Sequence, residues 1–212
     1  MLHDWDVALF RAIHHGMHHP WLDPIMEALT DPGPWKIPLL VLVGLLFIVL
    51  RGRRGAIGLV VLALTIAAAD QLSSNILKPL FRRVRPSSAL ADTLPLFGVR
   101  HSYSFPSTHA SNFFAAAPVT AAVFPEAAVF CYVYAAAVSF SRIYVGDHYP
   151  IDVLGGTILG LTLGFLGRKG FRRAERTLLG SRSIAAGVPA DAGAARSTQA
   201  SARGEKAPSG GP

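Results

Sequence analysis

The chain has 212 residues, of which 51% are hydrophobic and only 16% charged, yet its formal net charge is +7. A soluble domain of this size carries roughly 25% charged residues, so these values and a mean hydropathy of +0.38 argue against a soluble fold and indicate that apolar surface faces lipid. The positive residues stand beside apolar runs rather than on one basic face, which argues against nucleic-acid binding.

Residues 1–34 are predicted to form an interfacial segment ahead of the membrane core. Apolar side chains recur there at helical spacing beside polar ones, at Trp5, Leu9, Phe10 and Ile13. This pattern is typical of an amphipathic helix that lies in the membrane interface. If the segment crosses the bilayer instead, the count of spans rises from five to six.

Five weakly charged stretches are candidates for helical spans, because about 30 Å of hydrocarbon requires roughly 17–25 helical residues. They are residues 35–50, 55–77, 109–124, 127–145 and 151–167. Several are short, so their ends are expected to extend into the flanking loops. The predicted fold is therefore an all-α, polytopic transmembrane helical bundle of five to six helices over residues 35–170, preceded by the amphipathic helix.

Lys and Arg residues predict the orientation of these spans. Basic clusters lie after the first span and after the last one: Arg51, Arg53 and Arg54, then Arg168, Lys169, Arg172, Arg173 and Arg176. Both fall on one face, which the positive-inside rule makes cytoplasmic. Residues 171–212, rich in Ala, Gly, Ser and Arg, are predicted to be a disordered basic cytoplasmic tail. We expect a multi-pass protein of the inner (plasma) membrane.

The loop between the second and third spans violates this charge rule. On the predicted outer face it carries one acid, Asp92, and five cations: Lys78, Arg82, Arg83, Arg85 and Arg100. An anionic group bound at the outer membrane surface would favour such cations, and contact with bulk lipid headgroups is an equal alternative. Two roles are equally open for Arg82, Arg83 and Arg100. They would bind a second phosphate of the substrate, or they would contact bulk anionic lipid.

The start of the third span has features of an anion site. Pro106, Ser107 and Thr108 precede His109, and small hydroxyl residues at a helix start leave backbone N–H groups that can bind an anion. His109 would then stand beside that anion. The alternative is an ordinary Ser/Thr N-cap followed by an interfacial histidine.

Residues 141–152 link the fourth and fifth spans on the same face. Pro150 is typical of a first helical turn and places Asp152 in that turn, where its carboxylate can reach His148. A carboxylate on one ring nitrogen fixes the tautomer and leaves the other nitrogen as a nucleophile or base. Taken alone, such a pair is more often an ordinary hydrogen bond at a helix N-terminus than a catalytic pair.

The predicted topology brings the three segments to one depth on one face. The residues that converge are Lys78, Arg85, Ser107, His109, Arg142, His148 and Asp152. Cations hold non-bridging phosphate oxygens, while one histidine attacks phosphorus and the other protonates the leaving oxygen. The set therefore indicates phosphoryl transfer through a histidine.

These segments resemble the three signature motifs of the phosphatidic acid phosphatase type 2 superfamily, K-x6-R-P, P-S-G-H and S-R-x5-H-x3-D. Residues 78–86 match the first motif and residues 141–152 the third. Residues 106–109 match the second except that Thr108 stands where glycine is common, which adds a Cβ near the phosphate. The resemblance covers about residues 5–170.

The resemblance implies a role for each matching residue. His148 would be the nucleophile that forms a phosphohistidine, Asp152 would orient it, and His109 would be the general acid. The substrate phosphate would be bound by Lys78, Arg85, Ser107, Thr108 and Arg142. It also implies catalysis without a metal or other cofactor, in agreement with a pocket in which Asp152 is the only expected carboxylate.

The predicted function is that of an integral membrane lipid phosphatase whose active site is on the extracytoplasmic face, where a membrane phospholipid or polyprenyl phosphate can present its headgroup. Undecaprenyl diphosphate is the favoured substrate, ahead of phosphatidylglycerol phosphate and phosphatidic acid. One alternative is a lipid phosphotransferase. Another is a non-catalytic phospholipid-binding or transport protein, which has no need of a nucleophile with an orienting acid.

Two further features are open to interpretation. Residues His14, His15, His18 and His19 form pairs four apart that fit a transition-metal site if helical, although solvated positions on an interfacial helix are more usual. Asp70 lies inside the second span, where an acid is a functional candidate by default. The sequence shows no partner for Asp70, so a structural role is predicted for it.

Overall fold

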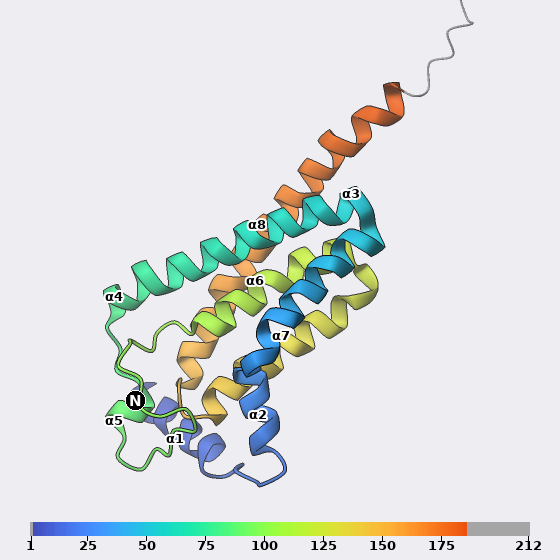
Figure 1. The fold of residues 1–212 in the computed structure, drawn as a ribbon. Coiled ribbons are helices and arrows are strands. Elements are labelled where there is room, and N and C mark those ends of the chain that lie inside the picture. The colour runs from blue at the N-terminus through green and yellow to red at the C-terminus, as the bar shows by residue number, and fades with distance from the viewer. Residues whose placement is uncertain (1, 186–212) are drawn as a thin grey trace, which may run out of the picture. The chain divides into compact units, whose positions relative to one another are not determined.

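The computed structural model describes residues 2–185 of the chain, and every regular element in that range is a helix. Residues Met1–Glu175 form one compact unit that contains the features discussed below. The elements are shown in Figure 1. The predicted all-α class is confirmed for this part of the chain.

The N-terminal segment is formed by helices α1 (Leu2–His14) and α2 (Asp23–Thr30), followed by a 3-10 turn, η1 (Gly33–Trp35). The helix predicted around residues 5–13 is therefore confirmed, but its apolar residues do not share one environment. Phe10 is fully buried against Ile143 and Tyr149, whereas Trp5 and Leu9 are exposed. Helix α1 thus packs on the core through Phe10, with Val7 and Ile13 partly buried beside it, and leaves Trp5 and Leu9 on the surface.

Helix α3 (Lys36–Gln71) contains two helical halves separated at Gly52. Gly52 has φ +52° and ψ −129°, a conformation that glycine adopts without a Cβ clash, and the chain reverses there (Figure 1). The break falls in the predicted basic loop. The second half continues without interruption into a π-helix, η2 (Leu72–Leu77), and the short helix α4 (Lys78–Phe81). The π-helix and α4 carry Lys78 to the functional end of the molecule.

The remaining elements are α5 (Pro86–Ala89), α6 (Thr108–Val123), the 3-10 turn η3 (Pro125–Ala127), α7 (Ala128–Tyr144) and α8 (Pro150–Ala185). By length and apolar composition, three helical stretches within the described residues are able to cross a membrane: Asp23–Ala89, Pro125–Tyr144 and Pro150–Leu179. Most large apolar side chains on the first half of α3 are exposed, as lipid-facing residues are.

The predicted disorder of residues 171–212 is wrong for residues 171–185, which continue helix α8. Phe171 is fully buried and packs with Phe47 and Val123, so this part of the helix gains apolar burial that composition alone did not reveal. The charged side chains that follow it are good helix formers. Residues 186–212 of the predicted tail lie outside the described residues.

Glycines bring α8 into backbone contact with α6. A Cβ added at Gly156, Gly160 or Gly164 would lie 2.4, 2.4 or 2.7 Å from a carbonyl oxygen of α6 or its N-cap. Small residues at four-residue spacing let two helices approach closely. The same contact continues at the functional end, where the Ser107 N–H donates to the Asp152 carbonyl at 2.9 Å.

The basic residues beside the Gly52 kink tie the opposite end of the unit together. Arg54 donates to the Val123 and Ala122 carbonyls at 2.5 and 2.6 Å, which satisfies acceptors that the end of α6 leaves free. Its Nε also pairs with Glu175 of α8. The first basic cluster and the end of the last span therefore lie at the same end, as predicted.

Candidate active site

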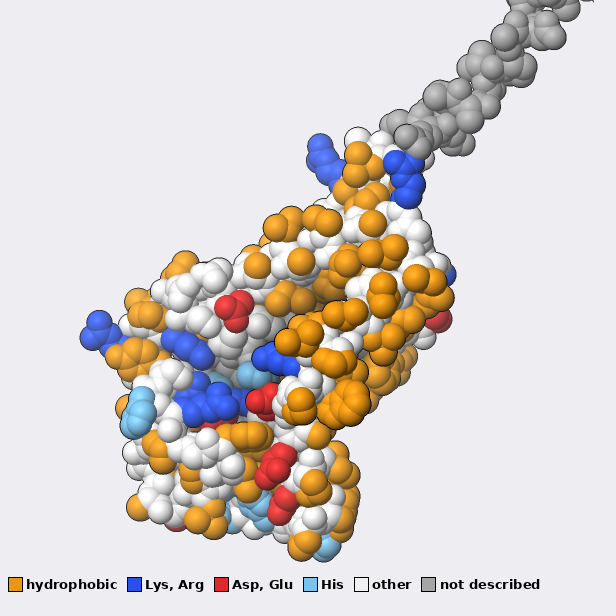
Figure 2. Space-filling view, in the orientation of Figure 1, with side chains coloured by type: hydrophobic (Ala, Val, Ile, Leu, Met, Phe, Trp, Pro, Cys, Tyr) orange, Lys and Arg blue, Asp and Glu red, His pale blue; other side chains and the backbone are white. Residues whose placement is uncertain are grey.

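The three predicted segments meet at one cavity of about 570 Å³. Six of the eight predicted site residues line it: Lys78, Arg85, Thr108, His109, Arg142 and His148. The other two, Ser107 and Asp152, are fully buried directly behind its wall. Figure 2 shows Lys and Arg side chains gathered around a hollow, with histidine on its floor.

Each side chain is placed by the end of a helix. Lys78 follows the π-helix, Arg85 is the N-cap of α5, and Thr108 begins α6. Arg142 lies in the last turn of α7, and its carbonyl accepts the N–H groups of Asp147 and His148, both at 3.1 Å. Helix termini offer unpaired backbone groups and fixed directions, so the ends of four helices define the position of the side chains predicted to bind phosphate.

Gly146 makes the turn that returns the chain from α7 toward the cavity. Its φ is +84°, and a Cβ there would lie 3.1 Å from the His14 ring and 3.0 Å from Thr93. A side chain at this position would therefore be strained by its backbone and crowded by its neighbours. The turn sets His148 two residues before Pro150, the first residue of α8.

The His148 ring presents Nε2 as an acceptor. Nε2 lies 3.1 Å from Nη1 of Arg85, and because a guanidinium only donates hydrogen bonds, Nε2 must carry a lone pair. In the neutral ring the proton is then on Nδ1. Burial, followed by the charges of Arg85 and Arg142, holds the pKa of His148 well below 6.5. A neutral ring with a free electron pair on Nε2 is the form needed for nucleophilic attack.

Asp152 lies beside this ring, but at more than hydrogen-bond distance. Its Oδ2 is 3.7 Å from Nδ1 of His148 and accepts the Tyr149 N–H at 2.9 Å, while Oδ1 accepts from Arg83 at 2.7 Å. The carboxylate is thus near enough to favour a protonated Nδ1 electrostatically. Within the described residues Nδ1 itself has no hydrogen-bond partner.

Arg83 does not occupy either of its two predicted environments. It donates to Asp152 and to Asp6 of α1, and its guanidinium lies 4.2 Å from the centre of the Tyr149 ring. The Asp6 side chain is fully buried, and its second oxygen accepts the Ile151 N–H at 2.9 Å. Arg83 is therefore bound inside the protein rather than to a second phosphate or bulk lipid.

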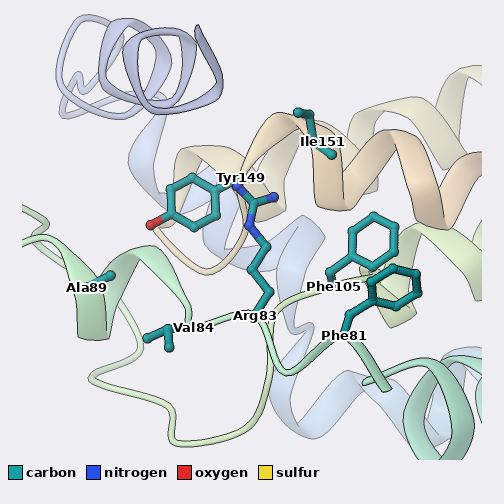
Figure 3. A pocket seen from close by; sticks show the side chains of 7 residues that line it. All are labelled: Phe81, Arg83, Val84, Ala89, Phe105, Tyr149 and Ile151. Atoms are coloured by element: carbon teal, nitrogen blue, oxygen red, sulfur yellow. The ribbon is translucent and has the colours of Figure 1, made fainter. Parts of the chain in front are cut away.

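Arg83 also borders a separate, mainly apolar cavity of about 610 Å³. Figure 3 shows Phe81, Phe105 and Ile151 around this space, with the Arg83 side chain extending toward Tyr149. This cavity contains none of the predicted catalytic or phosphate-binding side chains. Arg83 and Tyr149 line this cavity, and Arg83 also contacts Asp152.

Asp147 is a second buried acid that sequence analysis missed. Its carboxylate pairs with Arg142, lies 3.4 Å from Nε of Arg100 and 4.0 Å from Nη1 of Arg85. The expectation that Asp152 is the only carboxylate of the pocket is therefore wrong. The sequence feature that could have revealed Asp147 is its position directly before His148. Buried arginines that face one another need such a counter-charge.

Asp70 is also at the cavity, whose wall it shares with Lys78. The sequence identified no partner for it, and the structure supplies one, because Asn112 Nδ2 donates to its Oδ1 at 3.2 Å. Asp70 lies on α3 and Asn112 on α6, so this bond joins the helix that carries His109 to the helical stretch that continues to Lys78. Asn112 lies one helical turn after His109, and nothing in the sequence around it predicted a contact with Asp70.

The histidine cluster of the N-terminal segment forms part of the packing between α1 and α7. His14 is fully buried, its Nδ1 lies 2.7 Å from the Tyr144 carbonyl, and its Nε2 accepts the Leu94 N–H at 3.2 Å. Both ring nitrogens are therefore occupied, which leaves His14 no lone pair for a metal. Among the described residues, no group of three or more His, Cys, Asp or Glu side chains is placed to hold a metal ion.

Several polar atoms at the site have no protein partner. Within residues 2–185, the Ser107 hydroxyl and the Nε and Nη1 atoms of Arg142 are buried without a hydrogen bond. Each such group costs about 1–3 kcal/mol when left unpaired. Oxygen atoms of a phosphoryl group would accept hydrogen bonds from these donors.

Comparisons with known proteins agree with this geometry. Residues 58–176 match the model of the PAP2 superfamily. The chain is 34% identical over 175 residues to a lipid A 4'-phosphatase of Bacteroides thetaiotaomicron, covering 78% of this chain and 76% of that protein. It is 32% identical to the undecaprenyl-diphosphatase BcrC of Bacillus subtilis, over 74% of this chain and 80% of that protein.

A solved structure shares the fold. The crystal structure of a transmembrane PAP2-type phosphatidylglycerolphosphate phosphatase from Bacillus subtilis superposes with a TM-score of 0.62 at 31% identity, covering 81% of this chain and 86% of that one. The family resemblance read from the three motifs is thus confirmed by sequence and by fold. This chain belongs to the PAP2 superfamily of membrane lipid phosphatases.

Proposed function

We propose that this protein releases phosphate from a membrane lipid by way of a phosphohistidine on His148. The observation that carries the proposal is the shared cavity, in which His148, His109 and the three cationic side chains of the motifs, Lys78, Arg85 and Arg142, face one space. The unpaired donors of Ser107 and Arg142 support it, because they are the contacts that a phosphoryl group would complete.

The first step joins phosphorus to the histidine. Nε2 of His148 attacks phosphorus, the bond from phosphorus to the leaving oxygen breaks, and His109 donates a proton to that oxygen. Charge on the phosphoryl oxygens is stabilised by Lys78, Arg85 and Arg142. Attack requires Arg85 to exchange its contact with Nε2 for one with a phosphoryl oxygen.

The second step returns the enzyme to its starting state. His109, now without its proton, takes one from a water molecule as the water oxygen attacks phosphorus. The bond from phosphorus to Nε2 breaks, and inorganic phosphate leaves. Asp152 favours the proton on Nδ1 throughout, so that Nε2 is available at the start of each cycle.

The proposed topology has five crossings: the two halves of α3, then α6, α7 and α8. The Gly52 kink supports it by dividing α3 between two directions. The basic residues at the kink would be cytoplasmic by the positive-inside rule, which assigns the cavity to the extracytoplasmic face of the inner membrane. Helix α1 would lie in the interface, with Trp5 and Leu9 toward the lipid.

Undecaprenyl diphosphate is our first choice of substrate, followed by phosphatidylglycerol phosphate, phosphatidic acid and lipid A. The diphosphatase and phosphatidylglycerolphosphate phosphatase among the relatives support the first two choices, and the lipid A 4'-phosphatase supports the last. All present a phosphate group at headgroup depth on an apolar anchor, as a cavity open to the membrane requires.

The test offers this lipid panel to the purified protein in detergent with excess chelator. Release of inorganic phosphate by the wild type and its loss in His148→Ala are expected, together with a labelled protein adduct that is stable in base and labile in acid. Phosphate release that persists in His148→Ala would overturn the mechanism. Transfer of label to an added lipid acceptor instead of water would identify a phosphotransferase.

A further inference from the structure

The catalytic cavity adjoins a second cavity of about 380 Å³ that reaches between α2, the first half of α3, α6 and α7. The two cavities share six wall residues: Lys36, Leu40, Arg100, His109, Phe113 and Arg142. Beyond these, the second cavity is lined largely by apolar side chains, among them Leu29, Leu39 and Val43. A path therefore leads from the phosphate-binding side chains past His109 to an apolar region.

Two cations stand where the cavities meet, and neither belongs to a signature motif. Lys36 begins α3 and is exposed, and no ion pair or hydrogen bond of its side chain is present between residues 2 and 185. The nearest ion-pair contact of Arg100, Nε to Asp147 Oδ2, is 3.4 Å long, so most of its donors remain available. Asp31 is the one acid on the wall of the second cavity.

The reaction fixes what must lie at this junction. With the phosphoryl group against Lys78, Arg85 and Arg142, the leaving oxygen must be within reach of His109. The next atoms of the substrate then pass between Lys36 and Arg100, because both side chains share the cavity wall with His109. An apolar or hydroxyl-bearing group would leave Lys36 without a counter-charge in the bound state and would leave the remaining donors of Arg100 unused.

We infer that Lys36 and Arg100 form a subsite for a second phosphate, the one attached to the leaving oxygen, so that the preferred substrate is a lipid diphosphate. This inference rests on the proposed function and narrows its substrate class. The terminal phosphoryl group passes to His148, the bond between phosphorus and the bridging oxygen breaks, and His109 protonates that oxygen. The products are a lipid monophosphate, held at first by Lys36 and Arg100, and inorganic phosphate.

The test compares two probes with the same tail, farnesyl diphosphate and farnesyl monophosphate, in non-ionic detergent. The variants are Lys36→Gln and Arg100→Gln, with Lys36→Arg as the conservative replacement and exposed Arg53→Gln at the far end as the control. Loss of one charge-assisted hydrogen bond corresponds to about a tenfold change. We therefore expect Lys36→Gln to lower kcat/KM for the diphosphate about tenfold, mainly through KM, and to affect the monophosphate much less.

Lys36→Arg should restore most of the preference for the diphosphate, and Arg53→Gln should keep it. Equal losses on both probes in Lys36→Gln and Arg100→Gln, or a wild type without preference for the diphosphate, would overturn the subsite. A loss in Lys36→Gln that appears only with anionic lipid present would assign Lys36 to headgroup contact instead. Activity that survives His148→Ala would overturn the proposed function separately, whatever the two variants do.

Discussion

Asp6, near the start of the chain, forms a buried ion pair with Arg83, and the same guanidinium donates to Asp152, which lies beside His148. A helix outside the region matched by the family model thus reaches the acid that we propose sets the His148 tautomer. Helix α1 is therefore linked to Asp152 through Arg83 as well as packed on the core.

Asp6→Asn should lower kcat several-fold with little change in KM, because Asp6 acts through Arg83 and Asp152 rather than on the substrate. Breaking this largely buried pair should also cost about 2 kcal/mol of unfolding free energy, seen as a lower midpoint of thermal unfolding in detergent. Asp6→Glu should recover part of kcat.

Asp92→Asn is the matched control, since it removes another ion pair of α1, Arg11 with Asp92, whose side chains are 49% and 46% exposed. Exposed pairs contribute about 0–1 kcal/mol, so its kcat and thermal midpoint should stay near those of the wild type. If Asp6→Asn shifted the midpoint while kcat stayed constant, Asp6 would be structural only.

Asp147→Asn should make the site bind phosphate more tightly. The substitution removes the counter-charge of Arg142 and Arg100, so a phosphate dianion meets a larger positive potential. We expect the inhibition constant of inorganic phosphate to fall about tenfold and kcat to fall as product release slows.

The same variant should unfold at a lower temperature than the wild type in the absence of phosphate, and phosphate should raise its midpoint by more. Inhibition titrations and thermal unfolding with and without phosphate measure both effects, with Asp92→Asn again as the exposed control. An unchanged inhibition constant would show that Asp147 does not offset the charge of the phosphate-binding arginines.

The pH dependence of kcat/KM should have its acid limb below pH 6.5. His148 must be unprotonated to attack, and burial together with the Arg85 charge lowers its pKa below that value. Activity is then retained as pH falls through 6.5 and is lost only as pH passes the lowered pKa. A pH profile corrected for the substrate's own phosphate titration, followed by phosphorus NMR, measures this; an acid limb at or above 6.5 contradicts it.

Gly160→Ala should separate α6 from α8. The added Cβ would lie 2.4 Å from the Ser111 carbonyl oxygen and 2.9 Å from Phe114 Cβ, and overpacking of this kind costs about 1–3 kcal/mol. Activity should fall as well, because α6 carries His109 while α8 follows His148.

Gly170→Ala in the same helix is the comparison, since nothing lies within 4 Å of the added Cβ. Replacing a helical glycine by alanine there should stabilise the protein by up to about 1 kcal/mol. Equal thermal midpoints for the two variants would show that the close approach of α6 and α8 does not limit stability.

The predicted site residues depend on local patterns, and for that reason the sequence reveals them. A short helix end followed by Pro86 places Arg85 relative to Lys78. The turn at Gly146 and the helix start at Pro150 place Asp152 relative to His148. The break at Arg51–Arg54 was predictable in the same way, because charge and glycine interrupt an apolar run.

Contacts between distant segments had no such signal. The pairing of Asp6 with Arg83 joins residues 77 positions apart, and nothing in either neighbourhood requires the other. The helical course of residues 171–185 depends on burial of Phe171 against α3 and α6, which composition does not report. Tertiary packing decides such cases, where local propensity is weak.

The glycines of α8 have a consequence for how this site can change. Because α6 and α8 touch through backbone atoms, the spacing between the His109 and His148 segments is set by main-chain contact rather than by side chains that can shorten or lengthen. The half of the site that handles phosphorus therefore has fixed dimensions. The half formed by α2 and the first part of α3 has no such restriction, so discrimination among lipids is expected to diverge there while the reaction itself stays constant.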